Sequence, residues 1–219
     1  LTLLINDGTG AFTPLPTDIA SRGTAMFLAD LDGNGHADIC GLSQIEASSH
    51  CRGFTSILNA GDGIFPSPPR ITIGSLADPQ TIPTSLVVGD INNDGLDDFV
   101  TLNSTHHAIN FVLADPAGGY HAPVTLTTPP SPTLIRLGDL DGDGYLDAVV
   151  AHNDLNDQTS DLICIWMNTG GDLASAGTLP VLTGPEGLAI ADMDADGSVD
   201  IVVATNQYIG VPAALSVRF

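Results

Sequence analysis

The stretch LGDLDGDGYLDAVV, residues 137–150, crowds four aspartates into one short loop with a glycine at its sixth position. A hard divalent cation such as Ca²⁺ takes six to eight oxygen ligands at about 2.3–2.6 Å, and alternate side chains of a tight loop can converge on one ion. The backbone carbonyl of Tyr145, at position 7, adds another oxygen. The spacing therefore indicates a metal loop rather than a solvated acidic turn. Its side-chain ligands, at positions 1, 3, 5 and 9, are Asp139, Asp141, Asp143 and Asp147.

The same loop occurs three more times, always with Asp or Asn at positions 1, 3, 5 and 9 and glycine at position 6. Asn offers the carbonyl oxygen of Asp without the charge. The residue at position 7 differs in every copy, as expected where only its backbone carbonyl binds. This recurrence makes metal binding the preferred interpretation and predicts about four Ca²⁺ sites. The other expected ligands are Asp30, Asp32, Asn34, His36 and Asp38; Asp90, Asn92, Asp94, Leu96 and Asp98; and Asp192, Asp194, Asp196, Ser198 and Asp200.

Short apolar runs flank each loop, which predicts a β-hairpin with the acidic residues at its tip. A third apolar run follows a variable connection, and a Gly-rich turn leads to a fourth short segment. The loops begin at residues 30, 90, 139 and 192, an average period of about 54 residues. Four strands recurring at this period predict an all-β fold, a β-propeller of four-stranded antiparallel blades.

The DxDxDGxxD hairpins and the turns NDGTGAFTP and NAGDGIFPSP resemble FG-GAP/VCBS repeats, which occur in integrin α-subunit propellers and in many secreted microbial and fungal proteins. The resemblance covers nearly the whole chain. It implies Ca²⁺ between the first two strands of a blade and a closed ring of about seven blades. Two departures concern the turns: one reads ADPAGGYHAP, and the last repeat ends before any such turn. The loops match throughout.

The phase of the repeats is unusual. The segment LTLLINDGTGAFTPL matches the third and fourth strands of a blade, and AALSVRF matches a third strand, which gives about four and a half repeats. Unpaired strand edges invite association, so we expect either part of a larger propeller or blades completed between subunits, head to tail. Within one propeller domain, residues 1–219, the expected parts are a half blade at 1–20, blades at about 21–75, 76–128 and 129–182, and an incomplete blade at 183–219.

Composition limits the partners. The chain has a formal net charge of −21 at pH 7, with five Arg and no Lys. No basic stripe is present to neutralise phosphates, so neither nucleic acid nor an anionic membrane surface is an expected partner. No apolar run approaches about 18 residues, and no membrane span is expected. No catalytic motif is found, and the repeats account for the paired carboxylates, so no enzymatic activity is expected.

Several residues outside the loops have open alternatives. Cys40 and Cys51 flank one connection, and a disulfide between them would suit an oxidising compartment. Asn103 begins an N-S-T sequon, a candidate glycan site in a secreted eukaryotic chain, and Pro/Ser/Thr-rich connections are candidates for O-glycosylation. Cys164 and Trp166 lie on one predicted strand, and we expect both to pack in the core.

Together these features predict an extracellular or cell-surface calcium-binding β-propeller module with an adhesive, ligand-binding or structural role. Calcium would stabilise the blades. The ligand would be a protein or a carbohydrate, recognised by the variable polar connections between second and third strands. The alternative is the propeller portion of a larger secreted carbohydrate-active enzyme, or a lectin.

Overall fold

The computed structural model describes residues 2–15, 23–44, 52–61, 84–117, 119–153, 161–181, 184–205 and 215–217. All regular structure in these ranges is β-strand, and no helix is found among them. Accordingly, nothing in the described ranges is a helix long and apolar enough to cross a membrane.

Within the described ranges, sixteen strands form five antiparallel sheets. Two sheets have four strands, ordered β6-β7-β8-β9 and β10-β11-β12-β13; two have three, β3-β4-β5 and β14-β15-β16; and β1-β2 is a pair. The predicted all-β class with four-stranded antiparallel blades is confirmed. The strands are β1 (Leu3–Asn6), β2 (Phe12–Leu15), β3 (Gly23–Ala29), β4 (Asp38–Gln44), β5 (Arg52–Ile57), β6 (Ser85–Gly89), β7 (Asp98–Asn103), β8 (Ala108–Val112), β9 (Val124–Thr127), β10 (Pro132–Gly138), β11 (Asp147–His152), β12 (Leu162–Asn168), β13 (Leu173–Pro180), β14 (Pro185–Ala191), β15 (Asp200–Thr205) and β16 (Leu215–Val217).

The second strand of each four-stranded sheet, β7 or β11, is buried along its whole length. Such strands are rich in apolar and β-branched residues because other sheets cover both of their faces. Three apolar clusters fill the spaces between successive sheets: one around Phe99 joins β3–β5 to β6–β9, one around Trp166 joins β6–β9 to β10–β13, and one around Ile201 joins β10–β13 to β14–β16. Each blade is therefore stabilised mainly by its neighbours.

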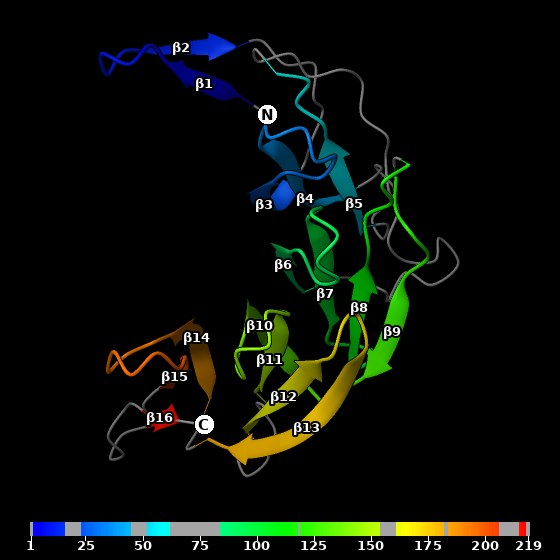
Figure 1. The fold of residues 1–219 in the computed structure, drawn as a ribbon, viewed down its shortest axis with the longest axis vertical. Coiled ribbons are helices and arrows are strands. Elements are labelled where there is room, and N and C mark those ends of the chain that lie inside the picture. Colours follow the sequence, from blue (N-terminus) through cyan, green and yellow to red (C-terminus); the bar gives the residue numbers. More distant parts are fainter. Residues whose placement is uncertain are drawn as a thin grey trace.

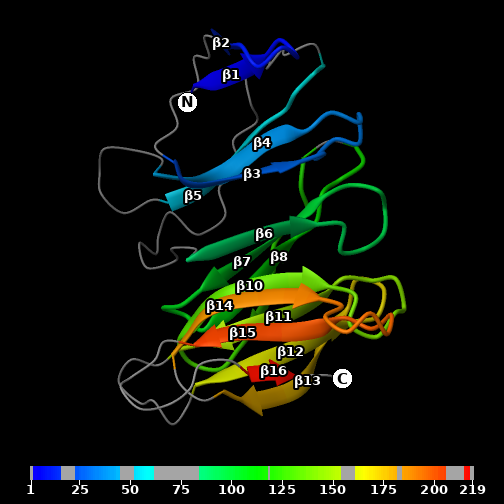
Figure 2. The same ribbon diagram turned by 90° about the vertical axis from the view of Figure 1, so that its left-hand side faces the viewer.

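The sheets follow one another along an open arc, with β3, β6, β10 and β14 on its inner side (Figure 1). These first strands contact one another in sequence along the arc. All four acidic loops emerge on the same face of the arc, because each first strand runs in the same direction (Figure 2). The limits of the blades stay predictions, since much of the chain between sheets, including residues 62–83, lies outside the described ranges.

The core contains two of the three cysteines. Cys40 and Cys164 are both free and buried, and the Cys40 thiol lies 3.5 Å from the carbonyl oxygen of Phe27. A disulfide between Cys40 and Cys51 is therefore not formed here; Cys51 itself lies outside the described residues. Burial raises the pKa of the Cys40 thiol to about 12, so it stays protonated and unreactive. As expected, Cys164 and Trp166 pack between blades.

Candidate metal centres

Each acidic loop connects the first and second strands of its blade and has the same backbone shape. Positions 4 and 6 both have positive φ in all four loops. Glycine tolerates this conformation, which explains the glycine at position 6. Position 4 is Asn93 in one loop and Ala195 in another, and the sequence pattern did not reveal its special conformation. The φ values at positions 4 and 6 are 70° and 81° for Gly33 and Gly35, 57° and 88° for Asn93 and Gly95, 78° and 91° for Gly142 and Gly144, and 61° and 94° for Ala195 and Gly197.

The aspartate at position 1 closes the loop on itself. Its Oδ2 accepts the N–H of the position-6 glycine in every copy, at 2.8 Å for Asp30, 2.9 Å for Asp90, and 3.0 Å for Asp139 and Asp192. Its Oδ1 accepts a second N–H, from position 4 or 5. Two hydrogen bonds to a charged acceptor fix the carboxylate so that it faces the middle of the loop.

The aspartate at position 9 is the first residue of the second strand and is buried in all four blades. In blade β10–β13, Asp147 Oδ2 accepts the N–H of Leu140 and Oδ1 accepts the N–H of Asn168, both at 2.8 Å. Asp38 and Asp98 accept the corresponding pairs of backbone N–H groups. This residue therefore ties the loop to the end of the third strand.

Burial raises the pKa of Asp38, Asp98 and Asp147, in each case against the lowering effect of the hydrogen bonds they accept. The shift is largest for Asp98, whose pKa rises to about 6. Nearby loop aspartates add to the upward shift in all three. Desolvation and like-charge repulsion both disfavour the ionised form, and a bound cation would relieve both.

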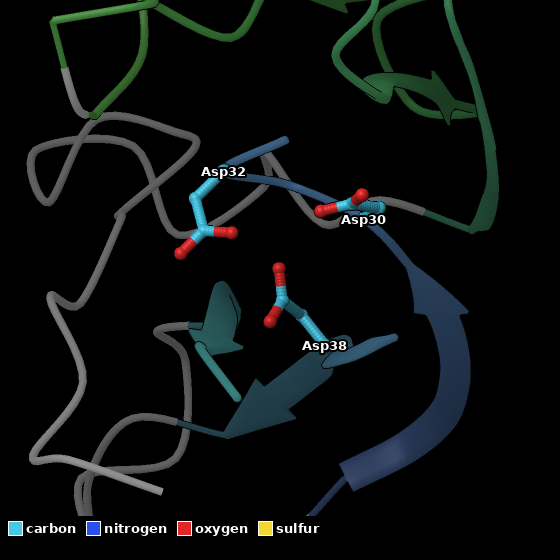
Figure 3. A group of neighbouring side chains, drawn as sticks. All are labelled: Asp30, Asp32 and Asp38. Carbon is cyan, nitrogen blue, oxygen red and sulfur yellow. The ribbon is translucent and has the colours of Figure 1, made fainter. Parts of the chain in front are cut away.

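Three of the loops bring carboxylate oxygens from positions 1, 3 and 9 within 4.8 Å of one another. Figure 3 shows Asp30, Asp32 and Asp38 directed toward a common point. The donors are all oxygens, the set preferred by hard cations such as Ca²⁺. The residues present therefore fit a calcium ion. The three groups are Asp30, Asp32 and Asp38; Asp139, Asp141 and Asp147; and Asp192, Asp194 and Asp200.

The side chains at position 5 are not part of these three groups. Instead, one oxygen of each accepts the backbone N–H of position 7, at 2.8–2.9 Å, in all four loops. Asn34, Asp94, Asp143 and Asp196 thus shape the turn, and their role as ligands stays a prediction.

Three of the four side chains at position 7 make packing contacts, although only the backbone carbonyl at this position was expected to have a role. A Cβ added at Gly61 would lie 3.0 Å from His36 Nε2, and one added at Gly170 would lie 3.6 Å from the Tyr145 ring. Leu96 is buried against Gly33 of the preceding loop, where an added Cβ would lie 2.8 Å from Leu96 Cδ2. Position 7 therefore packs loops against turns and against each other, while Ser198 is exposed.

The second loop differs from the others in its ligand set. Asn92 stands at position 3, so the loop does not form a three-carboxylate group of the kind found in the other described loops. The Asn92 amide nitrogen donates to Asp94 Oδ2 at 3.0 Å, and its oxygen accepts the N–H of Asp94 at 3.1 Å. The backbone of the loop is preserved, but position 3 offers an amide oxygen in place of a carboxylate.

Hydrogen bonds join the loops of neighbouring blades. The N–H of Asp30 donates to Asp97 Oδ2 at 2.9 Å, and the N–H of Asp97 donates to the Asp30 carbonyl at 3.2 Å. Asn93 Nδ2 donates to the carbonyl of Gly144 at 3.0 Å. These bonds connect the first three loops on one face of the arc.

Sequence reasoning missed the asparagines that end the third strands. Asn168 Nδ2 donates to the carbonyls of Ile91, at 2.7 Å, and Leu146, at 3.1 Å, so it links one blade to the loop of the previous one. Asn59 Nδ2 donates to the carbonyl of Ala37 at 3.2 Å. The signal was available, because each asparagine precedes a glycine by two residues, as in NAG and NTG.

The sequon asparagine is a structural residue. Asn103 is buried, its Oδ1 accepts the N–H of His106 at 2.9 Å, and its amide nitrogen lies 3.1 Å from His106 Nδ1. A glycan on this amide is incompatible with the folded chain as described. The open question of Asn103 glycosylation is therefore answered against it by burial.

Family comparison bears on the repeats directly. A family model described as FG-GAP-like repeat matches residues 90–150 and, again, residues 139–203. These two segments contain the second, third and fourth loops, and together they span about half of the chain. The chain belongs to the FG-GAP-like repeat family. The resemblance drawn from the loops and turns is confirmed, and the first loop of this FG-GAP-like chain keeps the same spacing outside the matched segments.

Solved structures share the fold of this FG-GAP-like chain. One is an Agrocybe aegerita lectin, described by its specific recognition of non-reducing terminal N-acetylglucosamine, with a TM-score of 0.64 and 19% identity over 98% of this chain. Another is the Photorhabdus luminescens Tc holotoxin pore, with a TM-score of 0.49 and 20% identity over 93% of this chain. The chain spans 59% of the lectin and 11% of the toxin chain. No curated protein sequence matches it.

Proposed function

We propose that this FG-GAP-like chain is an extracellular binding module whose blades are stabilised by calcium in the acidic loops. The convergence of three carboxylates in each of three loops is the observation that carries the proposal. Like charges held this close repel one another, and a divalent cation turns that repulsion into attraction. Position 9 supplies a carboxylate that is already buried and fixed by two backbone donors, so part of the ordering cost is met before the ion binds.

Calcium in these loops would be structural rather than catalytic. Asp38, Asp98 and Asp147, whose pKa is shifted upward by burial, have their carboxylate oxygens engaged by backbone N–H groups, which holds the loop to the third strand. Extracellular calcium modules bind with a Kd of about 10⁻⁴–10⁻³ M, which suffices where calcium is abundant. An extracellular location therefore follows from the proposal, and catalysis forms no part of it.

Calcium titration of the chelator-stripped chain by calorimetry tests the proposal. We expect saturable binding of at least three ions per chain, one for each three-carboxylate group. Magnesium is the matched control, because it demands a smaller octahedral shell and gives up its waters reluctantly, so it should bind more weakly. Absence of saturable calcium binding at millimolar concentrations would contradict the proposal.

Carbohydrate is the second candidate for the bound partner. The observation that favours it is the fold similarity to the Agrocybe aegerita lectin over 98% of this chain. Fold alone does not establish a ligand, so the sugar is a separate question from calcium. A glycan array probed in calcium, including glycans with terminal N-acetylglucosamine, distinguishes the candidates. Selective binding supports a lectin, and a uniformly negative array supports a protein ligand.

A further inference from the structure

The second acidic loop has an aspartate outside the positions expected to bind the ion. Position 8 of the loop is Asp97 in blade β6–β9, and in the other three blades it is Ala37, Leu146 or Val199. The expected ligands lie at positions 1, 3, 5, 7 and 9, so the calcium loop itself gives no reason for a carboxylate at position 8. Asp97 is also half-buried, where an ionised side chain is costly.

Position 8 of a loop reaches the preceding blade. In blade β10–β13, a Cβ added at Gly89, the residue just before the second loop, would lie 2.7 Å from Leu146 Cδ1. In blade β6–β9, Asp97 Oδ2 accepts the N–H of Asp30, the first residue of the first loop, at 2.9 Å. Both side chains therefore lie where the first strand of the preceding blade enters its loop. Of the two, only Asp97 offers a charged acceptor there.

The first and second loops are joined at three points. Besides its side-chain bond, Asp97 donates its own N–H to the carbonyl oxygen of Asp30 at 3.2 Å, so both backbone groups of Asp30 are held by one residue of the next blade. Leu96 is buried, and its Cδ2 would lie 2.8 Å from a Cβ added at Gly33. Positions 1 and 4 of the first loop are thus held by positions 7 and 8 of the second, on the same face of the arc (Figure 2).

Asp30 is the residue through which this contact reaches the candidate metal centre. Its carboxylate oxygens accept N–H groups of its own loop, from Asn34 and Gly35. In Figure 3 the carboxylate faces the same point as those of Asp32 and Asp38. The side chain of Asp30 is therefore oriented from within its loop, whereas its main chain is oriented from blade β6–β9.

The charge of Asp97 also bears on this centre. Burial raises the pKa of Asp97, the hydrogen bond with Asp30 opposes the rise, and the charges of Asp30 and Asp90 add to it. The Asp97 carboxylate therefore lies within electrostatic reach of the first residue of both loops. A cation in the first loop would be attracted by Asp97 as well as by its own ligands.

We propose that Asp97 is a positioning residue for the calcium site of the first loop, so that this site is built from two blades. The inference rests on the proposed function, since it concerns an ion bound by the first loop. Because Asp97 already fixes the N–H and the carbonyl of Asp30, less ordering remains to oppose binding. By linkage, calcium in the first loop must strengthen the contact between the two blades by the same factor.

Site-resolved calcium titration by NMR tests the proposal, with the amides of Gly35 and Gly197 reporting on the first and fourth loops. Asp97→Ala should weaken binding at the first loop about tenfold, as is usual when a group that orients a metal ligand is lost, and should leave the fourth loop unchanged. Asp97→Asn keeps an acceptor oxygen for the Asp30 N–H and loses only the charge, so it should retain part of the affinity. Asp172→Asn, at an exposed turn position, removes the same charge elsewhere and should change neither loop.

Hydrogen exchange in chelator tests the contact without calcium. The Asp30 amide should exchange faster in Asp97→Ala than in the unaltered chain, because its acceptor is gone. Asp97→Asn should keep the Asp30 amide protected. The amide of Asp192, the equivalent residue of the fourth loop, is the internal control and should exchange at the same rate in all three proteins.

The outcomes separate this inference from the proposed function. A loss of calcium affinity confined to the first loop, and smaller in Asp97→Asn than in Asp97→Ala, supports the positioning role. An unchanged first loop in Asp97→Ala would overturn the inference alone, as would an equal loss at the fourth loop, because a general loss of stability would then be the cause. A first loop that binds no calcium in the unaltered chain would also overturn it, and the fourth loop then shows whether the proposed function fails as well.

Discussion

The two ends of blade β10–β13 bury polar groups in different ways. At the loop end, buried Asp147 lies beside Asp139 and Asp141, with two backbone donors on its own oxygens. At the other end, buried His152 bridges Pro130 O, 2.9 Å from Nδ1, and Thr128 Oγ1, 3.1 Å from Nε2.

The difference lies in the charge that each end carries. A carbonyl only accepts, so Nδ1 of His152 donates to Pro130. Burial lowers the pKa of His152 and favours the neutral ring, whose Nε2 accepts from the Thr128 hydroxyl. The loop end holds several negative charges in one small volume. The opposite end is therefore complete without an ion, whereas the loop end gains from one. Chelator and acid should act on different ends of the same blade.

The largest expected effect is loss of the buried loop carboxylate. Asp147→Ala removes two hydrogen bonds to a charged acceptor and leaves one buried and one partly buried N–H group without partners, so we expect a loss of about 2–4 kcal/mol in the free energy of unfolding. Urea denaturation in chelator measures this without a contribution from calcium. Asp141→Ala, at an exposed position of the same loop, is the control and should cost about 1 kcal/mol or less. Equal losses would mean that burial at position 9 does not matter.

Removal of the half-buried Asp139 and the exposed Asp141 should abolish one calcium site, in addition to the cost of the two loop hydrogen bonds that Asp139 accepts. Asp139→Ala combined with Asp141→Ala should lower the calcium stoichiometry by one, as counted by calorimetry. The stabilisation lost with that ion is about 2.7 kcal/mol when calcium is at a hundred times its Kd. Asp115→Ala with Asp172→Ala removes the same charge outside the loops and should leave the count unchanged. An unchanged count in the first variant would exclude the third loop as a site.

Acid should reduce the stability that buried His152 contributes at the end of the blade opposite the loop. Burial lowers the pKa of His152, and the nearby His107 adds a smaller effect in the same direction. A group with a depressed folded pKa contributes stability that is present above its unfolded pKa, about 6.5, and is lost as the pH falls toward the folded value. We expect a loss of up to about 1.4 kcal/mol per pH unit below that point.

Urea denaturation between pH 7 and pH 5, in chelator, measures this slope. The variant His152→Gln removes the titrating ring, so acid should lower its stability less than that of the unaltered chain; the raised-pKa aspartates Asp38, Asp98 and Asp147 act in the opposite direction in both proteins. His121→Gln, at an exposed position, is the control and should keep the full slope. Identical slopes in all three proteins would show that His152 does not govern the acid response.

The smallest expected effect sharpens the comparison within the loop end. The second loop has the backbone of the third but carries Asn92 where the third carries Asp141. Asn92→Asp adds a carboxylate at position 3, and we expect a severalfold gain in calcium affinity, about 1 kcal/mol, because ligand charge tunes such loops. Site-resolved titration by NMR measures it. A weaker second loop in this variant would mean that Asn92 serves the backbone rather than the ion.

The hairpins and the blades could be predicted from the sequence because the same pattern of strands and loops occurs four times. The hairpins around Asp30, Asp90, Asp139 and Asp192 follow from short apolar runs on either side of each loop, and the period implied blades. Alternation along the strands also placed Trp166 between sheets. These are local signals, repeated four times.

The sequence could not supply contacts between repeats. The hydrogen bonds of Asp97 with Asp30 and of Asn168 with Ile91 depend on how neighbouring blades meet, which no single repeat encodes. The spacing also treated positions 1, 3, 5 and 9 alike, whereas position 9 is buried and position 5 binds its own turn. Asn103 read as a surface sequon because burial is set by the packing of β7 between sheets.

Thermal unfolding of the unaltered chain in millimolar calcium and in chelator tests the central claim most directly. An ion that binds only the folded chain must raise the melting temperature, and several sites per chain make the rise large. We predict a clearly higher melting temperature in calcium, with a smaller rise in magnesium. The same melting temperature in calcium and in chelator would contradict the account, because the carboxylates that converge in the loops would then be stable without an ion.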